Sequence, residues 1–400
     1  MNKPPLGHTP FSWINPSVPP LGHTTFSWSP LSKTSSNETK ESLERRSGPL
    51  SNFAGEEAAA LNTFYVTTAI NYTNGNPHVG HAYEGVTTDI VARYHRMFGR
   101  DTYFLTGTDE HGQKIALSAE KEGVAPIDIC DRYAGRFQEL NKRLQISNDD
   151  YIRTTQERHK TRAQELWKRC VANGDIWLGN YEGWYNVKEE QYVKESEAEQ
   201  MEYKDAAGNP LVKMSQPSYL LNMKKYQQEL INKINTDEFK IRPEARRQEI
   251  LKFLNEEELR DLSLSRNKFK WGVPIPGSDD HVMYVWFDAL SNYGTAIDFL
   301  NTDPKTNPLI RFWPASVHVI GKDITRFHCI YWPIMLMSAG IALPGGVYAH
   351  GFVMDKNGTK MSKSLGNVVD PNQLLDQLKE DGGKTSGKYT SEEKRASRKE

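Results

Sequence analysis

Residues 63–85 read "TFYVTTAINYTNGNPHVGHAYEG" and contain the change of pattern that decides the fold. The run at 63–70 is rich in β-branched and aromatic residues, which is typical of a strand, and the Asn/Gly/Pro-rich segment after it predicts a turn. A second apolar run at 102–107 completes a strand–helix–strand unit, for which a right-handed parallel crossover is expected. The helix between the two strands is predicted by apolar residues at helical spacing, which are Val79, Ala82, Val86, Ile90, Tyr94 and Met97, followed by Gly99 as a stop.

The rest of the chain predicts further alternating strands and helices, interrupted by one polar segment in the middle. Strand-like runs at 317–320 and 345–353 flank an apolar helix candidate at 324–339, whereas the middle of the chain is polar and helix-rich. The predicted fold class is α/β, a Rossmann-type doubly wound parallel sheet split by an α/β connective insertion, with disordered N- and C-terminal tails. The expected divisions are an N-terminal extension at 1–60, a first Rossmann half at 61–171, the insertion at 172–265, a second Rossmann half at 266–354, a loop and helix at 355–377, and a tail at 378–400.

The two tails are expected to be disordered for different reasons. The segment "PPLGHTPFSW" at 4–13 returns as "PPLGHTTFSW" at 19–28, in a Pro/Ser/Thr-rich setting without an acidic residue before Glu38. Such a scarcity of acids is typical of an organellar transit peptide, but no arginine precedes Arg45, so mitochondrion, plastid and cytoplasm all stay open as compartments. No branched aliphatic residue follows Leu378, so the C-terminal tail cannot build a core.

The bulk composition leaves the partner open. The chain has 37% hydrophobic and 25% charged residues, enough to bury a core, and its 50 basic and 51 acidic residues nearly cancel. Nucleic acid would therefore be bound by a local patch rather than by the net charge. No stretch has the ~20 continuous apolar residues of a membrane span, and nothing in the composition indicates an oligomeric state.

The segment "NPHVGHAYEG" places two histidines, His78 and His81, three positions apart at the start of a helix. Both rings can then face one ligand, and a helix N-terminus attracts phosphate through its N–H groups and dipole. Gly80 between them would allow a phosphate or a base to approach the backbone closely. A histidine at a helix start is also commonly a cap or a surface residue, so this motif alone is a modest signal.

A second basic motif, "KNGTKMSKSLGN" at 356–367, places Lys360 and Lys363 on a loop rich in Gly, Ser and Asn. Lysines on a mobile loop can close over a polyphosphate and meet the charge that develops during its reaction. The alternative is a solvated surface loop. A similar string, "VKMSQPS" at 212–218, lacks the second lysine and the preceding glycine and is interpreted as coincidence.

The order strand, HxGH, helix, insertion, further α/β and KMSKS resembles that of class I aminoacyl-tRNA synthetases. Within that class, the text resembles the methionyl-tRNA synthetase family over about residues 62–375. The phrases that carry this second resemblance are "TTAINYTNGNPHVGHAYE", "FLTGTDEHGQKI", "YEGWY", "RPEARRQEIL", "LSRNKFKWGVPIPG", "YVWFDALSNY" and "VIGKDITRFHCIYWPIML".

The resemblance implies a methionine-tRNA ligase that uses ATP and Mg²⁺ to make methionyl-adenylate and then charges tRNA(Met). It implies His78, His81, Lys360 and Lys363 as catalytic residues. The residues implied to bind ATP are His78, Gly80, His81, Gly321, Asp323, Lys360, Met361, Ser362, Lys363 and Ser364. The residues implied to bind methionine are Asp109, as the partner of the α-ammonium group, and Ile70, Tyr72, Trp286, Ala289, Leu290, Tyr293, Ile324, His328 and Trp332 as walls. Apolar and aromatic walls suit a thioether, although each such residue alone is commonly part of a core.

The chain departs from the family pattern in two places. Residues 171–265 contain no cysteine, so a zinc knuckle of thiolates is not expected there, and the three cysteines, Cys130, Cys170 and Cys329, have no metal-ligand spacing. After "LGNVVDPNQLLDQ" the family continues into a helical domain that reads the anticodon, whereas this chain is expected to lack that domain and to charge tRNA inefficiently. The alternatives are a paralogue that binds nucleotide or RNA without charging, a class I synthetase for another apolar amino acid, and a nucleotidylyltransferase.

Overall fold

The described part of the chain is built on one parallel sheet. A computed structural model describes residues 62–187, 191–193, 195–205, 208–267, 269–355, 357–359, 361 and 367–386, so the predicted extension at 1–60 lies outside the described residues. The sheet has seven strands in the order β2-β3-β1-β12-β13-β8, with β4 also paired to β3, and every pairing is parallel. Its strands are β1 (Thr63–Thr68), β2 (Asn71–Tyr72), β3 (Asp101–Asp109), β4 (Asp150–Arg153), β8 (Lys240–Arg242), β12 (Val317–Gly321) and β13 (Gly346–His350).

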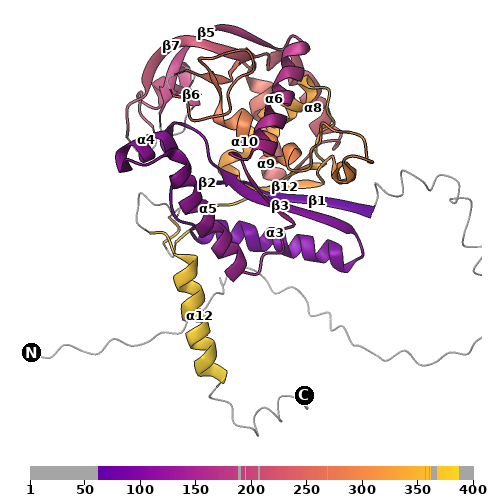
Figure 1. The fold of residues 1–400 in the computed structure, drawn as a ribbon. Helices are drawn as coiled ribbons and strands as arrows, with labels where there is room; N and C mark the ends of the chain where they lie inside the picture. Colours follow the sequence, from indigo (N-terminus) through magenta and orange to yellow (C-terminus); the bar gives the residue numbers. More distant parts are fainter. Residues whose placement is uncertain are drawn as a thin grey trace, which may run out of the picture. The chain divides into compact units, whose positions relative to one another are not determined.

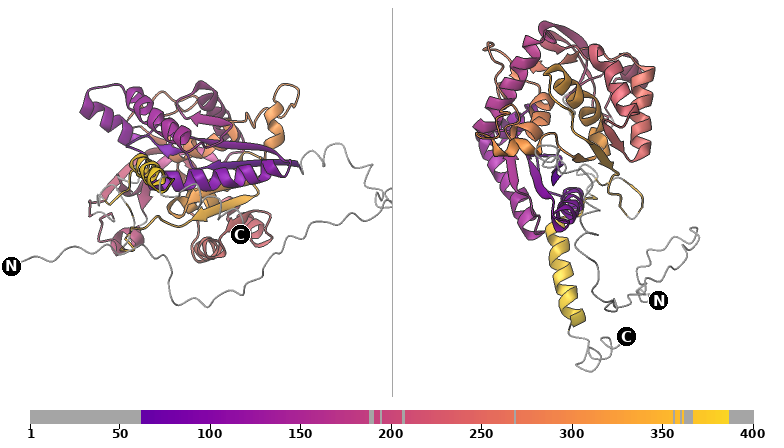
Figure 2. Two further views of the ribbon diagram at one scale, coloured as in Figure 1. Left: turned by 90° about the horizontal axis from the view of Figure 1, so that it is seen from below. Right: turned by 90° about the vertical axis from the view of Figure 1, so that its right-hand side faces the viewer.

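Helices cover both faces of this sheet, which confirms the predicted doubly wound α/β fold. Helix α3 (Val79–Met97) joins β1 to β3 and lies with α5 (Pro126–Arg143) on one face, while α6 (Glu157–Ala172) and α10 (Val285–Thr295) lie on the other (Figures 1 and 2). Strand β3 is buried at all positions but its first, as expected of a parallel strand covered on both sides. The neighbours of β1 are β3 and β12, so the strand order reverses at β1, and ligands bind beyond the carboxyl ends of the strands at such a point.

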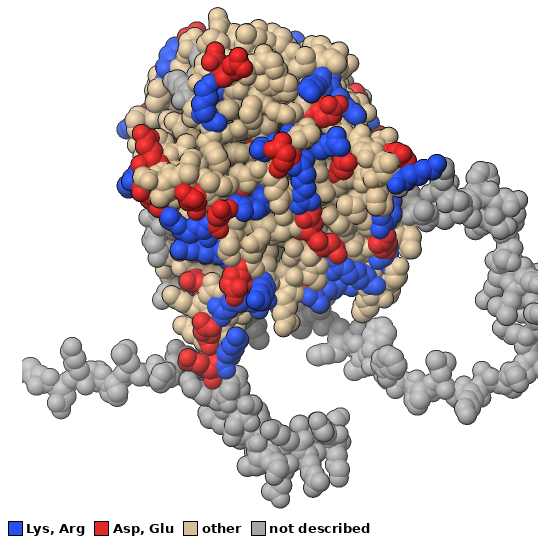
Figure 3. Space-filling model, viewed as in Figure 1, with Lys and Arg blue, Asp and Glu red and all other residues tan. Residues whose placement is uncertain are grey.

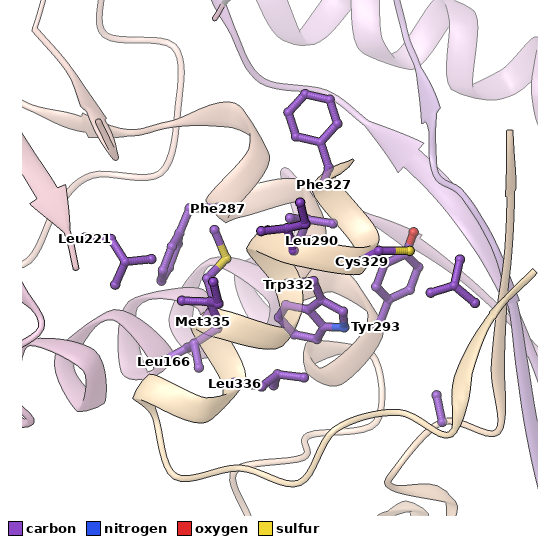
Figure 4. Close-up of a cluster of buried hydrophobic side chains, with 14 of the residues drawn as sticks. Leu166, Leu221, Phe287, Leu290, Tyr293, Phe327, Cys329, Trp332, Met335 and Leu336 are labelled. Carbon is purple, nitrogen blue, oxygen red and sulfur yellow. The ribbon is translucent and has the colours of Figure 1, made fainter. Parts of the chain in front are cut away.

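The main core lies on the α10 side of the sheet. Phe287 and Leu290 of α10 pack with Trp332, Met335 and Leu336 of α11 (Trp332–Ser338), and all five side chains are buried (Figure 4). A π-helical turn at Phe327–Tyr331 leads directly into α11. The wall of side chains behind the carboxyl ends of the strands is therefore a closely packed layer, which can hold a binding site rigidly.

Most of the apolar residues that predict α3 do not form its buried face, and Ala82 is the exception. Ile90, Tyr94 and Met97 are 62%, 54% and 75% exposed, whereas Ala82, Thr88, Asp89 and Ala92 are buried. Small residues allow the helix to approach the sheet closely, so the larger side chains point outward. The spacing of the apolar residues predicted the helix correctly, but the helix packs against the sheet with a different face.

The central insertion contains more strand than its polar sequence indicates. Strands β5 (Ile176–Asn186), β6 (Gln191–Val193), β7 (Val212–Leu221) and β9 (Leu262–Ser263) form an antiparallel sheet, and α7 (Glu195–Gln200), α8 (Lys224–Asn235) and α9 (Glu244–Glu256) accompany it. The second KMS string belongs to β7, where Met214 pairs with Gly183 of β5, so it is part of a ladder and not of a loop.

The expected limits of the insertion differ from the structure at one strand. Strand β8, which lies within 172–265, pairs with β13 and so belongs to the main sheet. Only three residues long, β8 gives too short a pattern to be recognised from sequence. Two further short strands, β10 (Ser265–Arg266) and β11 (Val282–Met283), pair with each other. In the first half of the main domain, helix α4 (Gln113–Glu122) follows β3.

The helix expected after the KMSKS loop is α12 (Pro371–Ser386), which continues past residue 378, where the tail was expected to begin. A helix that has been nucleated adds residues at little cost, so a polar sequence can prolong it. Arg143 of α5 donates hydrogen bonds to Asn372 and Asp376 and fixes the first turns of α12.

The exposed charges are mixed in sign. On the face shown in Figure 3, basic and acidic side chains are interspersed. None of the described helices is long and apolar enough to cross a membrane.

Candidate functional site

A cavity of about 770 Å³ opens beyond the carboxyl ends of β1, β3, β12 and β13. These strands bring together residues that are far apart in sequence, since Tyr72 follows β1, Asp109 ends β3, Gly321 ends β12 and His350 ends β13. The sequence-predicted residues that line it are Ile70, Tyr72, His78, Gly80, His81, Asp109, Trp286, Ala289, Leu290, Tyr293, Gly321, Asp323, Ile324, His328 and Met361. The structure thus joins both predicted groups, for nucleotide and for amino acid, in one cavity.

The two histidines at the start of α3 are held by backbone donors. His78 is the N-cap: its Nδ1 accepts a hydrogen bond of 3.1 Å from the Gly80 N–H, and His81 Nδ1 accepts one of 3.0 Å from the His78 N–H. In the neutral ring, an Nδ1 that accepts has no hydrogen, so each ring carries its hydrogen on Nε2 and can donate there. The rings stack 3.7 Å apart, and a Cβ at Gly80 would lie 2.9 Å from His78 Cε1, so glycine makes room for this arrangement.

The base of the KMSKS loop is tied to this helix. The Val79 N–H donates to the Val369 carbonyl oxygen at 3.1 Å, and Asn367 Nδ2 donates to Asp355 Oδ2 at 2.9 Å. Asp355 also accepts from the N–H groups of Asn357 and Thr359, and so closes the turn that precedes the lysines. Met361 lines the cavity. Lys360, Ser362, Lys363 and Ser364 lie outside the described residues.

The predicted amino-acid end of the cavity has aromatic and apolar walls. Trp286 stacks on Phe327 with ring centres 3.6 Å apart, and Tyr293 and His328 share a hydrogen bond of 2.6 Å between the hydroxyl and Nε2. His328 Nδ1 lies 3.0 Å from the Ile324 carbonyl oxygen, so Nδ1 is the donor and Nε2 accepts from Tyr293. Burial lowers the pKa of His328 to about 4, which keeps this ring neutral near pH 7.

Trp332 does not line the cavity, unlike the other residues predicted as methionine walls that the structure describes. It is fully buried behind Tyr293, with ring centres 6.2 Å apart, and belongs to the core of α11. Its place in a matching phrase did not distinguish a residue of the wall from one that supports the wall.

Asp109, at the end of β3, supplies a carboxylate to the lining of the same cavity. Its side chain lies in the cavity wall and the residue is 9% exposed. Its carbonyl oxygen accepts from both the N–H and the hydroxyl of Thr73, at 3.1 and 3.2 Å, which fixes the backbone at the end of β3. A carboxylate in a largely dry site favours a cationic partner.

Glu84 and His350 are among the cavity residues that were missed from the sequence, as are Lys114 and Phe327. Glu84 Oε2 lies 2.9 Å from His350 Nε2, and its Oε1 accepts from the Ala69 N–H. Burial raises the pKa of Glu84 despite this contact, and the hydrogen bond with Glu84 raises the pKa of His350 although burial opposes it. Glu84 lies one helical turn after His81 on the same helix face, which was the available signal.

His318 is a second buried histidine, and its ring stacks on Tyr293, which lines the cavity. It is fully buried, its Nδ1 lies 2.9 Å from Thr67 Oγ1, and its ring stacks on Tyr293 at 4.1 Å. Burial lowers the pKa of His318 well below its ordinary value.

We expect the two buried histidines, His318 and His328, to make the stability of the fold sensitive to acid. The folded-state pKa values of His318 and His328 lie below the unfolded value, so their stabilisation is complete above about pH 6.5 and is lost as the pH falls. For His328 the shift from 6.5 to about 4 corresponds to about 3 kcal/mol. Urea unfolding from pH 4.5 to 8 should show the loss in the native chain and a flatter curve in His318→Asn, which keeps a polar atom beside Thr67. Parallel curves for the two proteins would contradict this assignment.

A second cavity of about 820 Å³ adjoins the first, and Asp323 and Phe327 line both. It lies between the insertion and the second half of the main domain. Its lining includes Tyr181, Tyr192, Lys213, Arg260 and Arg326. The aromatic rings suit stacking on nucleic-acid bases. The charges of the lining are mixed in sign, because it also carries the acidic residues Glu182, Glu195, Glu197, Glu249, Asp261 and Asp323.

Comparisons with known proteins identify the class to which this site belongs. The family model described as tRNA synthetases class I (M) matches residues 64–209 and 204–384, and the chain belongs to this family. The chain is 49% identical over 319 residues to the methionine–tRNA ligase of Rhizobium meliloti (strain 1021), covering 79% of this chain and 61% of that protein. It is 47% identical over 326 residues to the methionine–tRNA ligase of Listeria monocytogenes serovar 1/2a (strain ATCC BAA-679 / EGD-e), covering 79% of this chain and 48% of that protein.

Solved structures agree with the family assignment. The Mycobacterium tuberculosis methionyl-tRNA synthetase in complex with methionyl-adenylate superposes with a TM-score of 0.74 at 46% identity, covering 79% of this chain and 62% of that chain. The chain therefore spans between 48% and 62% of the length of these relatives. Among the described residues, no group of three or more His, Cys, Asp or Glu side chains is arranged to hold a metal ion.

Proposed function

We propose that this chain activates methionine with ATP, as its Mg²⁺ complex, to give methionyl-adenylate, and transfers the methionyl group to tRNA(Met). The observation that carries the proposal is that one cavity joins the paired histidines of α3, the Asp109 carboxylate and the Trp286–Phe327 wall. Relatives named methionine–tRNA ligase and a neighbour bound to methionyl-adenylate support the same reaction.

In the first step, a carboxylate oxygen of methionine attacks the α-phosphorus of ATP, and the bond from this phosphorus to the pyrophosphate oxygen breaks. Asp109 would hold the α-ammonium group, and the apolar wall of α10 would receive the thioether side chain. The Nε2–H groups of His78 and His81 would donate to phosphate oxygens, on which charge grows as pyrophosphate leaves. Asp323, beside Gly321, would accept from the ribose hydroxyls or the ammonium group.

In the second step, the terminal ribose hydroxyl of the tRNA attacks the methionyl carbonyl carbon and AMP leaves. The second cavity is the place we propose for the last nucleotides of the tRNA, because the rings of Tyr181 and Tyr192 can stack on bases and the cavity shares Phe327 with the first cavity. Neither step requires a covalent intermediate on the protein, so catalysis is positioning and charge stabilisation.

Pyrophosphate exchange into ATP with a panel of amino acids tests the proposal. We expect methionine to support exchange, and leucine, valine and cysteine to support it with kcat/KM lower by at least about tenfold, since a change of packing in an apolar pocket is worth ~1–3 kcal/mol. Exchange that depends equally on all four, or that prefers another apolar amino acid, would contradict methionine as the substrate. Charging of tRNA(Met) by the same preparation distinguishes a ligase from a paralogue that only activates the amino acid.

A further inference from the structure

A buried chain of hydrogen bonds lies behind the amino-acid wall and has no place in the mechanism above. Asp288 Oδ2 lies 2.6 Å from His111 Nδ1, and Asp288 Oδ1 lies 2.6 Å from His159 Nε2. Their exposed fractions are 0% for Asp288, 4% for His111 and 0% for His159, and none of the three lines the cavity. The two histidines hold the pKa of Asp288 low, at about 2, although burial opposes this. A buried carboxylate is costly unless it is paired in this way.

The two arms of this chain lead to different places. His111 lies two residues after Asp109, in the turn between β3 and α4. His159 lies in the first turn of α6, and its Nδ1 lies 2.8 Å from Thr295 Oγ1, which belongs to α10 like Asp288. The first arm therefore joins α10 to the cavity carboxylate, and the second joins α10 to a helix of the core.

The turn that carries His111 is held on its other side by Trp271. Trp271 Nε1 donates to the Glu110 carbonyl oxygen at 2.6 Å, and the Gly112 N–H donates to the Trp271 carbonyl oxygen at 3.2 Å. The rings of His111 and Trp271 are in edge contact, 5.5 Å apart. The turn is thus held between Trp271 and Asp288, and it directly follows Asp109, whose backbone is also held by Thr73 and by pairing with β2.

One side of helix α10 faces the cavity, and another side faces the two buried histidines. Trp286, Ala289, Leu290 and Tyr293 line the cavity, whereas Asp288 points to the histidines. Because a helix is rigid over a single turn, the Asp288–His111 contact links the α10 wall to the turn that follows Asp109.

We propose that Asp288 and His111 are positioning residues that set the width of the amino-acid end of the cavity, between the Asp109 carboxylate and the wall formed by Trp286 and Ala289. The proposal deepens the proposed function and rests on it, since it assigns this end to the amino acid. Neither residue touches the substrate. They act by holding the Asp109 carboxylate, which binds the ammonium group of the amino acid, at a fixed distance from Trp286 and Ala289, which pack on its side chain.

The two arms supply a matched pair of variants. His111→Gln moves the donor away from the position of Nδ1, and His159→Asn moves it away from the position of Nε2, so each breaks one buried 2.6 Å contact with the same carboxylate. His111→Asn retains a donor at the position of Nδ1 and serves as the conservative rescue. KM for methionine and KM for ATP in pyrophosphate exchange are measured for all three, with melting temperatures.

We expect His111→Gln to raise KM for methionine by about tenfold, with KM for ATP within about twofold of the native value, because only the amino-acid end loses its spacing. His111→Asn should restore KM for methionine to within about twofold. His159→Asn should lower the melting temperature as much as His111→Gln does, and leave both KM values nearly unchanged.

Equal changes of KM for methionine in His111→Gln and His159→Asn would overturn the proposal, as would no change in His111→Gln. If His111→Gln does not fold, Trp271→Phe, which removes the hydrogen bond to the Glu110 carbonyl oxygen and reduces the ring beside His111, loosens the same turn and carries the same expectation: KM for methionine rises and KM for ATP does not. An unchanged KM for methionine in that variant would overturn the proposal equally. Absence of methionine-dependent exchange in the native chain would instead contradict the proposed function itself.

Discussion

His78→Asn is expected to slow the formation of methionyl-adenylate by about 10²–10³-fold, with helix α3 as stable as in the native chain. Asparagine is a good N-cap, and its Oδ1 can accept from the Gly80 N–H as His78 Nδ1 does. The variant therefore keeps the cap and removes the Nε2 donor that would meet the phosphates, together with the ring that stacks on His81. Loss of one preorganised donor to a developing charge typically costs that factor in kcat. Single-turnover mixing with ATP and methionine measures the rate.

The melting temperature of the variant supplies the control for this prediction. A rate loss accompanied by an unchanged melting temperature separates phosphate contact from capping. A native rate of adenylate formation in a folded His78→Asn protein would show that the His78 ring serves only as a cap, which is the alternative that the sequence motif leaves open.

Asp109→Asn is expected to weaken methionine binding by about 100-fold. The substitution keeps the shape of a side chain that is only 9% exposed but removes the negative charge that we propose holds the α-ammonium group. Removing one partner of a buried charge pair costs ~2–5 kcal/mol, and the factor of about 100 lies toward the lower end of that range. Isothermal titration of the native and variant chains with methionine measures the change directly.

A ligand without the ammonium group completes the test of Asp109. The deamino analogue of methionine should bind the native chain weakly and should not bind Asp109→Asn more weakly, because the group that Asp109 contacts is already missing. An equal loss of affinity for methionine and for this analogue would mean that Asp109 supports the pocket without contacting the ammonium group.

The strand–helix–strand unit could be predicted from sequence because its signals are local. The β-branched run before "NPHVGH" and the helical spacing after it lie within about two dozen residues of each other, and both elements form where expected. The buried face of α3 could not be predicted, since the choice between the Ile90 side and the Ala92 side depends on how closely the sheet approaches. Strand β8 was missed because its ladder is provided by β13, about a hundred residues later.

The residues of the candidate site could be predicted where the resemblance to the family places the same residue at the same point of the chain. Asp109, Trp286 and His328 fall in the cavity wall, whereas Trp332, in the same phrase as His328, lies behind it. Resemblance fixes the place of a residue in the chain, and packing decides which side chains of a helix reach the cavity. The partners of Asp288 could not be inferred, because three separate elements meet at this carboxylate and no spacing in the sequence records their contact.

Direct detection of methionyl-adenylate tests the central claim most simply. The native chain is mixed with methionine, ATP and Mg²⁺ in the presence of pyrophosphatase, and the protein-bound product is analysed by mass spectrometry after rapid filtration. We expect methionyl-adenylate bound at about one equivalent per chain, and none when methionine is replaced by its deamino analogue. A folded chain that binds ATP and methionine but forms no adenylate would contradict the account.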